Sequence, residues 1–524
     1  MSDSPPQVEA PKALPFWREL LGILPWGFLY LLTLTENFSA THDSIAYLNE
    51  LELDPEISWY SHHLLWHPFM KAWISLWPAS VAVYIRIELL HAICGMILLM
   101  LFYTFVRKRF DLPMRTAYAA TALPALSYGI WCYSTVVEVY IMPLCALMGC
   151  LLLLTQTRQH LSSGLLASAL LAIAILFHQS HILFIPAFLF GIYWNRDQHR
   201  MSGTSLIGLH LLVLAIFVGL PYLGVMTTVL EMQSLADMWN WLVGYGHTST
   251  YWAEPGMGML TQAGVGAGRS FIGGQFAFGL ESIASGTART GFGLSDEAFL
   301  VRTLKQDWIL ILIGISVGFV LWMFSNLIRL PYRWKAASAR HQQLAKLLSL
   351  ALLSYSLFFL FWVPVNPEFW LPQMLFLCLL IGRFRLMSHR AWLAIPAYAL
   401  GAINYWGSMA HLQFGENDLY EVEAREMATF AGENDRIILT DSWIRAEYLR
   451  RYSGASITVV PIWLAEGGSY ESLIAGIESD LQVYRQIILQ VDFSDTTSDP
   501  AWWAPLEDRL EVINLETGPF YLLR

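Results

Sequence analysis

The sequence predicts a polytopic α-helical membrane protein with about eleven transmembrane helices, followed by a small C-terminal α/β domain. Of its 524 residues, 56% are hydrophobic and only 14% are charged. Long apolar runs fill the chain up to about residue 410, whereas the part from residue 412 onwards holds 8 Lys and Arg against 20 Asp and Glu. We therefore expect a disordered cytoplasmic tail over 1–16, a membrane domain over 17–410 and a soluble domain over 411–524.

Each predicted span needs roughly 20 mainly apolar residues to cross the bilayer. The fifth and sixth are shorter and flank the polar segment 177–181. All five cysteines fall inside apolar runs, so we expect buried thiols rather than disulfides. The predicted spans are 17–35, 80–106, 116–134, 137–155, 164–178, 181–194, 204–228, 307–328, 344–364, 369–383 and 391–409.

The distribution of Lys and Arg between the loops predicts the orientation, because cytoplasmic loops are enriched in basic residues. One set of loops holds 17 Lys and Arg, and the opposite set holds 6. The N-terminus is therefore expected in the cytoplasm, in a multi-pass protein of the cytoplasmic membrane. With an odd number of spans, the first loop and the C-terminal domain share the outer side, periplasmic or lumenal. A nucleic-acid partner is not expected, since the sequence has no basic stripe.

Two outer loops are long, 36–79 and 230–306. The second has a glycine-dense middle over 256–274, which lowers the cost of irregular backbone. This loop either closes over a substrate or is only a flexible connector. The first loop gathers carboxylates and imidazoles directly after the first span, where such groups are either solvated or functional. They are Glu36, His42, Asp43, Glu50, Glu52, Asp54, Glu56, His62, His63 and His67.

Beyond residue 412 helices and strands alternate. Helices are predicted over 420–430, 442–452 and 470–484, and strands over 436–440, 457–462, 486–491, 510–514 and 520–523. This alternation favours a small α/β layer with mostly parallel strands. Because no glycine-rich phosphate turn is present, a dinucleotide site is not expected.

Asp43 is the candidate general base. At the membrane surface, about eight residues past the first span, a carboxylate is partly desolvated, which raises its pKa toward the range of a useful base. An Asp in a loop is by itself more often a solvated surface residue, but three other features map to the same surface. His67 precedes Pro68, Glu138 lies at the outer end of the fourth span, and Glu368 lies in a very short outer turn.

Other polar residues at this surface have alternative interpretations. Glu138 either reaches water or faces a cavity. His178 and His181, three residues apart, could bind phosphate, ligate a metal or only cap the membrane end of the helices.

The order of these motifs resembles the GT-C class of membrane glycosyltransferases, which includes protein O-mannosyltransferases and lipid A aminoarabinose transferases. In that class an Asp follows the first span in a long outer loop, often with a His-Pro before the second span. Asp43 and His67-Pro68 match this pattern. The Glu-Val-Tyr run at 138–140 is similar to a signature of one O-mannosyltransferase-like branch, and the segment 367–372 resembles a late turn that opens a span with a proline. The first loop departs from the class, since it has no Asp-Glu dyad.

The resemblance implies inverting transfer of a sugar from a polyprenyl-phosphate carrier to an acceptor lipid, glycan or protein at the outer face of the membrane. Because a phosphate leaving group needs little protonation, one carboxylate base is sufficient, and positive charge or hydrogen-bond donors must meet the phosphate. Asp43 is then the base, with His42, His67, Glu138, Tyr140 and Glu368 in supporting positions. The candidates for binding the donor phosphate are Arg86, His178, His181, Arg302 and Lys305.

No cofactor is certain. The histidines at 42, 62, 63 and 67 could hold a divalent metal together with Asp43 or Glu36, although their spacing fits no recognised motif. The C-terminal domain is expected to modulate acceptor use without holding catalytic groups, because its acidic excess repels a phosphate carrier. An outer rim of tryptophans could stack on sugars or serve only as interfacial anchors. These are Trp59, Trp66, Trp131, Trp239, Trp241 and Trp252.

A transporter or flippase of lipid-linked or amphiphilic substrates is the alternative function. Transporters favour ionisable sites near the midplane of the bilayer and often contain paired repeats. Here the ionisable groups gather at one surface and no repeat is visible, which favours an enzyme. A receptor that binds through its C-terminal domain would leave the first-loop chemistry unexplained.

Overall fold

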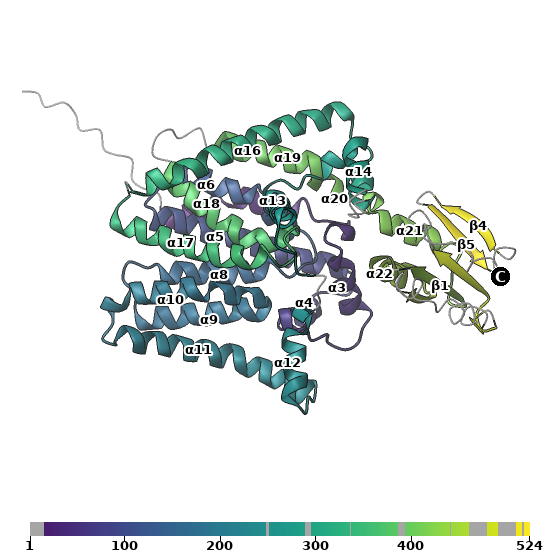
Figure 1. The fold of residues 1–524 in the computed structure, drawn as a ribbon, viewed down its shortest axis with the longest axis horizontal. Coiled ribbons are helices and arrows are strands. Elements are labelled where there is room, and N and C mark those ends of the chain that lie inside the picture. The colour runs from purple at the N-terminus through teal and green to yellow at the C-terminus, as the bar shows by residue number, and fades with distance from the viewer. Residues whose placement is uncertain are drawn as a thin grey trace, which may run out of the picture.

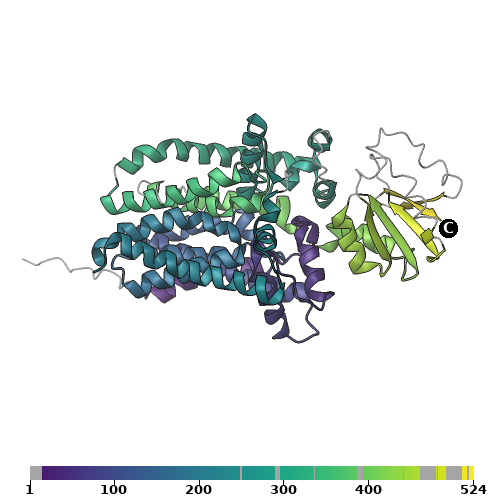
Figure 2. The ribbon, with the colours of Figure 1, turned by 60° about the horizontal axis from the view of Figure 1, so that its bottom comes forward.

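The computed structural model describes residues 15–247, 251–288, 295–335, 337–385, 394–440, 442–460, 479–480, 482–490, 510–515 and 518–523. Long helices lie side by side in one bundle, and a small domain containing a β-sheet stands at one end of it (Figures 1 and 2). Most of the predicted tail over 1–16 and most of the predicted helix over 470–484 lie outside the described residues.

Helices occupy each of the eleven predicted spans. The first span is divided into α1 (Phe16–Leu21) and α2 (Leu24–Leu31). The third is divided into α6 (Met114–Ala125) and α7 (Tyr128–Tyr133), because a proline stands in the last turn of α6 and the backbone at residue 127 is extended. The others are α5 (Val83–Arg109), α8 (Ile141–Leu154), α9 (Leu161–Phe177), α10 (Ile185–Trp194), α11 (Gly203–Gly224), α16 (Gln306–Lys335), α17 (Ala339–Phe359), α18 (Leu371–Arg385) and α19 (Ala394–Asn404).

Among the described residues, three helical stretches are long and apolar enough to cross a membrane by themselves: Val83–Arg109, Gly203–Val229 and Gln306–Tyr332. Shorter apolar helices cover Ile141–Leu154, Leu161–Phe177 and Gln179–Trp194. The fold is therefore that of a helical membrane protein, and the count of eleven spans stays a prediction. All five cysteines are free, three of them buried and two half-buried, in agreement with the expected thiols.

The two long loops, 36–79 and 230–306, fold largely into short helices at the end of the bundle that faces the C-terminal domain (Figure 1). The first loop forms α3 (Asp43–Glu52), η2 (Ser61–His63) and α4 (Trp66–Ser75). The second loop forms α12 (Leu235–Val243), α13 (Met257–Phe271), η8 (Gln275–Gly279), α14 (Glu281–Ala288) and α15 (Ser295–Leu300). The turn before α18 forms η9 (Pro367–Trp370).

The glycine-dense run is not irregular backbone, which corrects the prediction. Residues 257–271 are the helix α13, and one of its glycines, Gly266, allows close packing. A Cβ atom at Gly266 would lie 2.3 Å from the carbonyl oxygen of Pro364 and 2.7 Å from the indole nitrogen of Trp370. The absence of a side chain therefore lets α13 lie directly against the segment that carries Glu368.

The C-terminal domain has the predicted α/β character. After α20 (Ala410–Leu412) come α21 (Leu419–Met427) and α22 (Trp443–Tyr452). The strands form one sheet in the order β2-β1-β3-β5-β4, in which β2, β1 and β3 are parallel and β5 and β4 form an antiparallel hairpin. The strands are β1 (Asp435–Thr440), β2 (Ser456–Val460), β3 (Gln486–Gln490), β4 (Leu510–Leu515) and β5 (Gly518–Leu523).

Candidate active site

Asp43 is the first residue of α3, and the backbone on both sides of it is tied to other parts of the outer face. The preceding His42 has φ 56° and ψ −43°, a conformation that a non-glycine residue keeps only where its surroundings hold it. Its Nε2 atom lies 2.9 Å from Oδ2 of Asp296 in α15. On the other side, Ser44 Oγ donates a hydrogen bond of 2.8 Å to the carbonyl oxygen of Val137. Asp43 is therefore held between α15 and the connection that precedes α8.

The Asp43 side chain is accessible to solvent and yet surrounded by protein on most sides. Loss of hydration in this recess is the main reason that the pKa of Asp43 is raised from 3.8 to about 6. The negative charge of Glu368 contributes in the same direction, the positive charge of His42 opposes it, and Glu50 adds a smaller increase. An accessible carboxylate with a pKa near neutrality has the properties required of a general base.

Two further carboxyl groups lie close to Asp43. Glu368 in η9 accepts hydrogen bonds from Tyr133 Oη at 2.9 Å and from Asn366 Nδ2 at 2.8 Å. Glu138 is buried in the connection between α7 and α8, and burial raises its pKa well above the usual value. The charges of Asp43 and Glu368 raise the pKa of Glu138 further, so the three groups interact electrostatically. The structure therefore brings Asp43, Glu138 and Glu368 together at one surface, as the sequence predicts.

His67 acts on this region indirectly, because it contacts Glu50 in α3, the helix that begins with Asp43. Its Nε2 atom lies 2.5 Å from Oε2 of Glu50, and the other carboxylate oxygen of Glu50, Oε1, accepts a hydrogen bond from Tyr60 Oη. Although burial acts in the opposite direction, these two partners lower the pKa of Glu50. The His67 ring also stacks on His63, with the ring centroids 5.4 Å apart. The His-Pro motif thus holds the second half of α3 in place.

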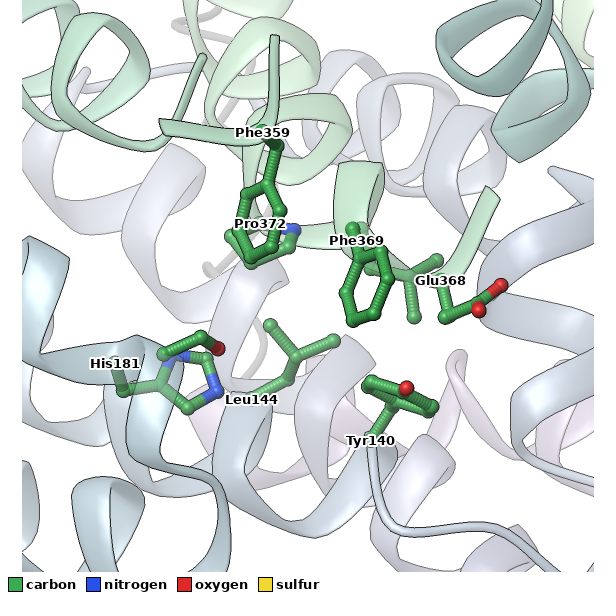
Figure 3. Close-up of a pocket in the computed structure, with 9 residues that line it drawn as sticks. Tyr140, Leu144, His181, Phe359, Glu368, Phe369 and Pro372 are labelled. Carbon is green, nitrogen blue, oxygen red and sulfur yellow. The ribbon is translucent and has the colours of Figure 1, made fainter. Parts of the chain in front are cut away.

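A narrow cleft lies beside the carboxyl groups, at the ends of α8, α17 and α18. Figure 3 shows the rings of Tyr140, Phe359 and Phe369 facing this space, with His181 on one side and Glu368 on the other. The free space inside it is about 10 Å³, roughly enough for one water molecule, so a larger ligand would require the lining side chains to move. A mainly apolar cleft with polar groups at its ends suits a ligand that joins an apolar chain to a polar head.

The two histidines between α9 and α10 use one ring nitrogen each within the protein. His178 Nδ1 lies 2.7 Å from Ser180 Oγ, and His181 Nδ1 lies 2.7 Å from Tyr355 Oη. Their rings lie 6.2 Å apart, and the His178 ring is 5.1 Å from that of Tyr140. Within the described part of the chain, each histidine therefore has Nε2 left for a ligand, and both lie next to the cleft.

Two of the predicted phosphate-binding cations are occupied by other partners. Arg86 Nε and Nη1 donate to the carbonyl oxygens of Val81 and Ile74 at 2.7 and 3.2 Å. Arg302 donates to Asn417 Oδ1 at 3.1 Å and to the carbonyl oxygen of Glu416 at 2.9 Å. Lys305 is exposed between α15 and α16. The arginines therefore act as structural ties in this state of the protein.

Arg269 is a site residue that the sequence analysis did not identify. It forms an ion pair with Glu297 of α15, and its Nε donates to the carbonyl oxygen of Gly273 at 3.0 Å. Burial raises the pKa of Glu368, and the charge of Arg269 is one of the influences that lower it. The sequence did offer one signal for Arg269, since it is one of only six basic residues in its set of loops. It was not identified as a site residue because its glycine-rich surroundings indicated an irregular loop.

The tryptophans of the predicted outer rim differ in their exposure. Trp66 and Trp131 are buried, and their indole nitrogens donate to the Glu138 carbonyl oxygen and to Thr33 Oγ1, so the prediction that these two form a sugar-stacking rim is wrong. Trp239 and Trp252 are exposed. In the part of the chain that the structure describes, no group of three or more His, Cys, Asp or Glu residues is arranged to hold a metal ion. The histidines of the first loop instead pack against one another and against tyrosines.

The fold is similar to that of a solved membrane protein, ArnT. The crystal structure of ArnT from Cupriavidus metallidurans bound to undecaprenyl phosphate aligns with a TM-score of 0.51, covering 97% of this chain and 98% of that chain. The apo structure of the same protein aligns with a TM-score of 0.53, covering 97% of both chains. Sequence identity is 10% in both comparisons, so this likeness concerns the fold.

Part of the sequence matches a family model. Residues 66–224, from the start of α4 to the end of α11, match the family described as dolichyl-phosphate-mannose-protein mannosyltransferase. No curated protein matches the chain by sequence. The match and the fold confirm the resemblance to the GT-C class.

Proposed function

We propose that the protein is an inverting glycosyltransferase that moves a sugar from a polyprenyl-phosphate carrier to an acceptor lipid, glycan or protein. The observation that carries this proposal is the raised pKa of Asp43, about 6, at the mouth of a recess that also holds Glu138 and Glu368. The family match over residues 66–224 and the ArnT-like fold support the same class of reaction.

The reaction is a single displacement. The acceptor hydroxyl or amine gives its proton to the Asp43 carboxylate as its oxygen or nitrogen bonds to the anomeric carbon from the face opposite the phosphate. The bond between the anomeric carbon and the phosphate oxygen breaks, and the polyprenyl phosphate leaves with the electron pair. One displacement inverts the configuration at the anomeric carbon. No acid is needed on the leaving side, since phosphate is already a stable anion.

The donor phosphate is proposed to lie between the carboxyl groups and the outer-loop cations. Arg269 is our first choice for binding it, because its charge already acts on Glu368. His178 and His181 offer Nε2 donors from the other side of the cleft. The apolar cleft beneath them suits the beginning of a polyprenyl chain. Arg86, Arg302 and Lys305 are second choices. Arg269 also has two donors engaged, by Gly273 and Glu297, so the preference for it rests on its charge acting on Glu368.

The site is proposed to face the outer side of the cytoplasmic membrane, together with the C-terminal domain. The excess of basic residues on the opposite loops supports this orientation. Lipid-linked sugars present their polar heads at the membrane surface, which is where the recess lies relative to the helical bundle.

A direct assay separates a transferase from a transporter. Purified protein in liposomes is incubated with a polyprenyl-phosphate sugar that is radiolabelled in the sugar, together with membrane extract as the source of acceptor. A transferase breaks the bond between sugar and phosphate and releases unlabelled polyprenyl phosphate. Movement of intact labelled donor between the leaflets, without cleavage, would instead support the transporter and contradict the proposal.

A further inference from the structure

The helix that begins with Asp43 shares a hydrophobic core with the C-terminal domain. Phe38, Ile45 and Leu48 are buried in the same cluster as Tyr448 and other residues of that domain. The cluster also contains Tyr420, Ala424, Met427, Ile437, Leu439 and Ile488. The apolar face of α3 is therefore completed by the C-terminal domain, more than 370 residues later in the chain.

One carboxylate joins the two parts just before Asp43. Asp418 is fully buried, and its Oδ2 accepts hydrogen bonds from the backbone N–H groups of Phe38 at 2.9 Å and Ser39 at 3.1 Å, and from Tyr448 Oη. Its Oδ1 accepts from the N–H groups of Tyr420 at 3.1 Å and Glu421 at 3.2 Å, so the same side chain caps α21. Asp418 thereby fixes the backbone four to five residues ahead of Asp43 to the first helix of the C-terminal domain.

The far end of α3 is attached to α22. Asn49 Nδ2 donates to the carbonyl oxygen of Glu447 at 2.8 Å, and Arg451 Nη1 lies 2.5 Å from Glu52 Oε2. Arg450 forms a further ion pair with Asp54, just beyond the helix. Asp43 thus lies between two attachments to the C-terminal domain, one before it and one after it.

We infer that the C-terminal domain is a positioning part of the active site, in which Asp418 acts through α3 to hold the Asp43 carboxylate in its recess. This inference rests on the proposed function and goes beyond it, since the domain was expected only to modulate acceptor use. Asp418 touches neither donor nor acceptor and is a positioning residue. A general base displaced by about 1 Å can lose on the order of a hundredfold in rate, so a distant tie of this kind has a measurable effect.

The test compares Asp418→Asn with Asp435→Asn in the full-length protein. Asp435 is equally buried, but it bonds to Gly432 and Arg485 within the C-terminal domain, so it is a matched control for general damage to that domain. The variants are compared by thermal unfolding, by kcat and KM for the lipid-linked donor, and by the pH dependence of kcat/KM. An asparagine has one acceptor oxygen and cannot receive both sets of N–H donors.

The inference predicts that Asp418→Asn lowers kcat at least tenfold and leaves KM for the donor within about twofold. In the plot of kcat/KM against pH, the fall in activity on the acid side should move below pH 6, because the displaced Asp43 carboxylate gains hydration and its pKa falls. Asp435→Asn should stay within about twofold of the wild type. Equal kinetics of the two variants would overturn the inference. A wild type that does not transfer sugar would instead contradict the proposed function itself.

A charge exchange keeps the inference testable if Asp418→Asn does not fold. Glu52→Arg and Arg451→Glu each place like charges across the contact between α3 and α22 and should each lower kcat. The double variant restores an opposite-charge pair and should recover most of the lost kcat. Single variants without effect, or a double variant as slow as the single ones, would overturn the inference.

Discussion

Replacement of Glu368 by Gln should move the acid limb of the pH–rate profile without removing the base. The wild-type limb in kcat/KM is expected at about pH 6, the pKa of Asp43. Loss of hydration is the largest cause of that raised value, and the charge of Glu368 is the largest contribution from another residue. Glu368→Gln removes the charge and keeps the shape of the side chain and one acceptor oxygen for its hydrogen bonds.

The expected size follows from the order of these causes. Because loss of hydration is the main cause of the raised pKa, removal of the Glu368 charge should lower the pH of the acid limb by about half a unit to one unit. It should not return the pKa of Asp43 to the ordinary value for Asp. Asp43 must be ionised to accept a proton, so activity falls below the limb. At pH 5 the wild type should show roughly one tenth of its plateau kcat/KM, and Glu368→Gln roughly one quarter to one half of its own plateau.

The assay measures initial rates of sugar transfer from a polyprenyl-phosphate sugar between pH 4.5 and 8, with each variant normalised to its own plateau. Normalisation separates the shift from any loss of positioning in the variant. Glu56→Gln is the control, since Glu56 is an exposed carboxylate of the same loop, and its limb should stay at about pH 6. An unshifted limb in Glu368→Gln, or a wild-type limb near pH 4, would refute the assignment of the limb to Asp43 in its recess.

Two other predictions concern phosphate binding and orientation. Arg269→Gln should weaken binding of undecaprenyl phosphate, measured by thermal stabilisation, at least tenfold more than Arg302→Gln does, because the charge of Arg269 acts on Glu368 beside the proposed phosphate position; equal losses would contradict the choice of Arg269. Single cysteines at the exposed positions Glu56 and Glu433, in a cysteine-free background, should react with an impermeant maleimide in intact cells, and labelling only after permeabilisation would reverse the orientation.

Much of the fold could be predicted because its determinants are local. Runs of apolar residues specify the helices, and the alternation after residue 412 specifies the strands β1 to β5. The glycine-dense segment was misjudged because glycine content indicates irregular backbone, whereas here Gly266 permits close packing against Pro364 and Trp370. That contact joins residues about a hundred positions apart, which no local pattern reveals.

The candidate site was partly predictable for the same reason. Asp43, Glu138 and Glu368 each follow or precede an apolar run, so topology alone places them at one surface. The partners of each side chain depend on tertiary contacts. Arg86, Arg302 and Arg269 belong to the same set of loops in the sequence, and only the structure shows that the charge of Arg269 acts on Glu368.

The attachment of α3 to the C-terminal domain could not be predicted either, and it changes how truncation is interpreted. If the C-terminal domain only modulated acceptor use, removal of the chain after about residue 412 would leave carrier binding intact. It would also expose Phe38, Ile45 and Leu48 and leave the N–H groups of Phe38 and Ser39 without Asp418. Point variants at Asp418 therefore test the role of the domain without exposing these apolar side chains, which truncation would do.

The most direct test of the account is the transfer rate of Asp43→Asn beside that of Glu56→Gln and the wild type. All three should bind undecaprenyl phosphate, measured by thermal stabilisation, because the substituted asparagine would keep the shape of the side chain and the recess. Loss of a general base costs about 10²–10⁴ in rate, so Asp43→Asn should transfer sugar at least a hundredfold more slowly while Glu56→Gln matches the wild type. Transfer by Asp43→Asn within about tenfold of the wild type would contradict the role of Asp43 as the base.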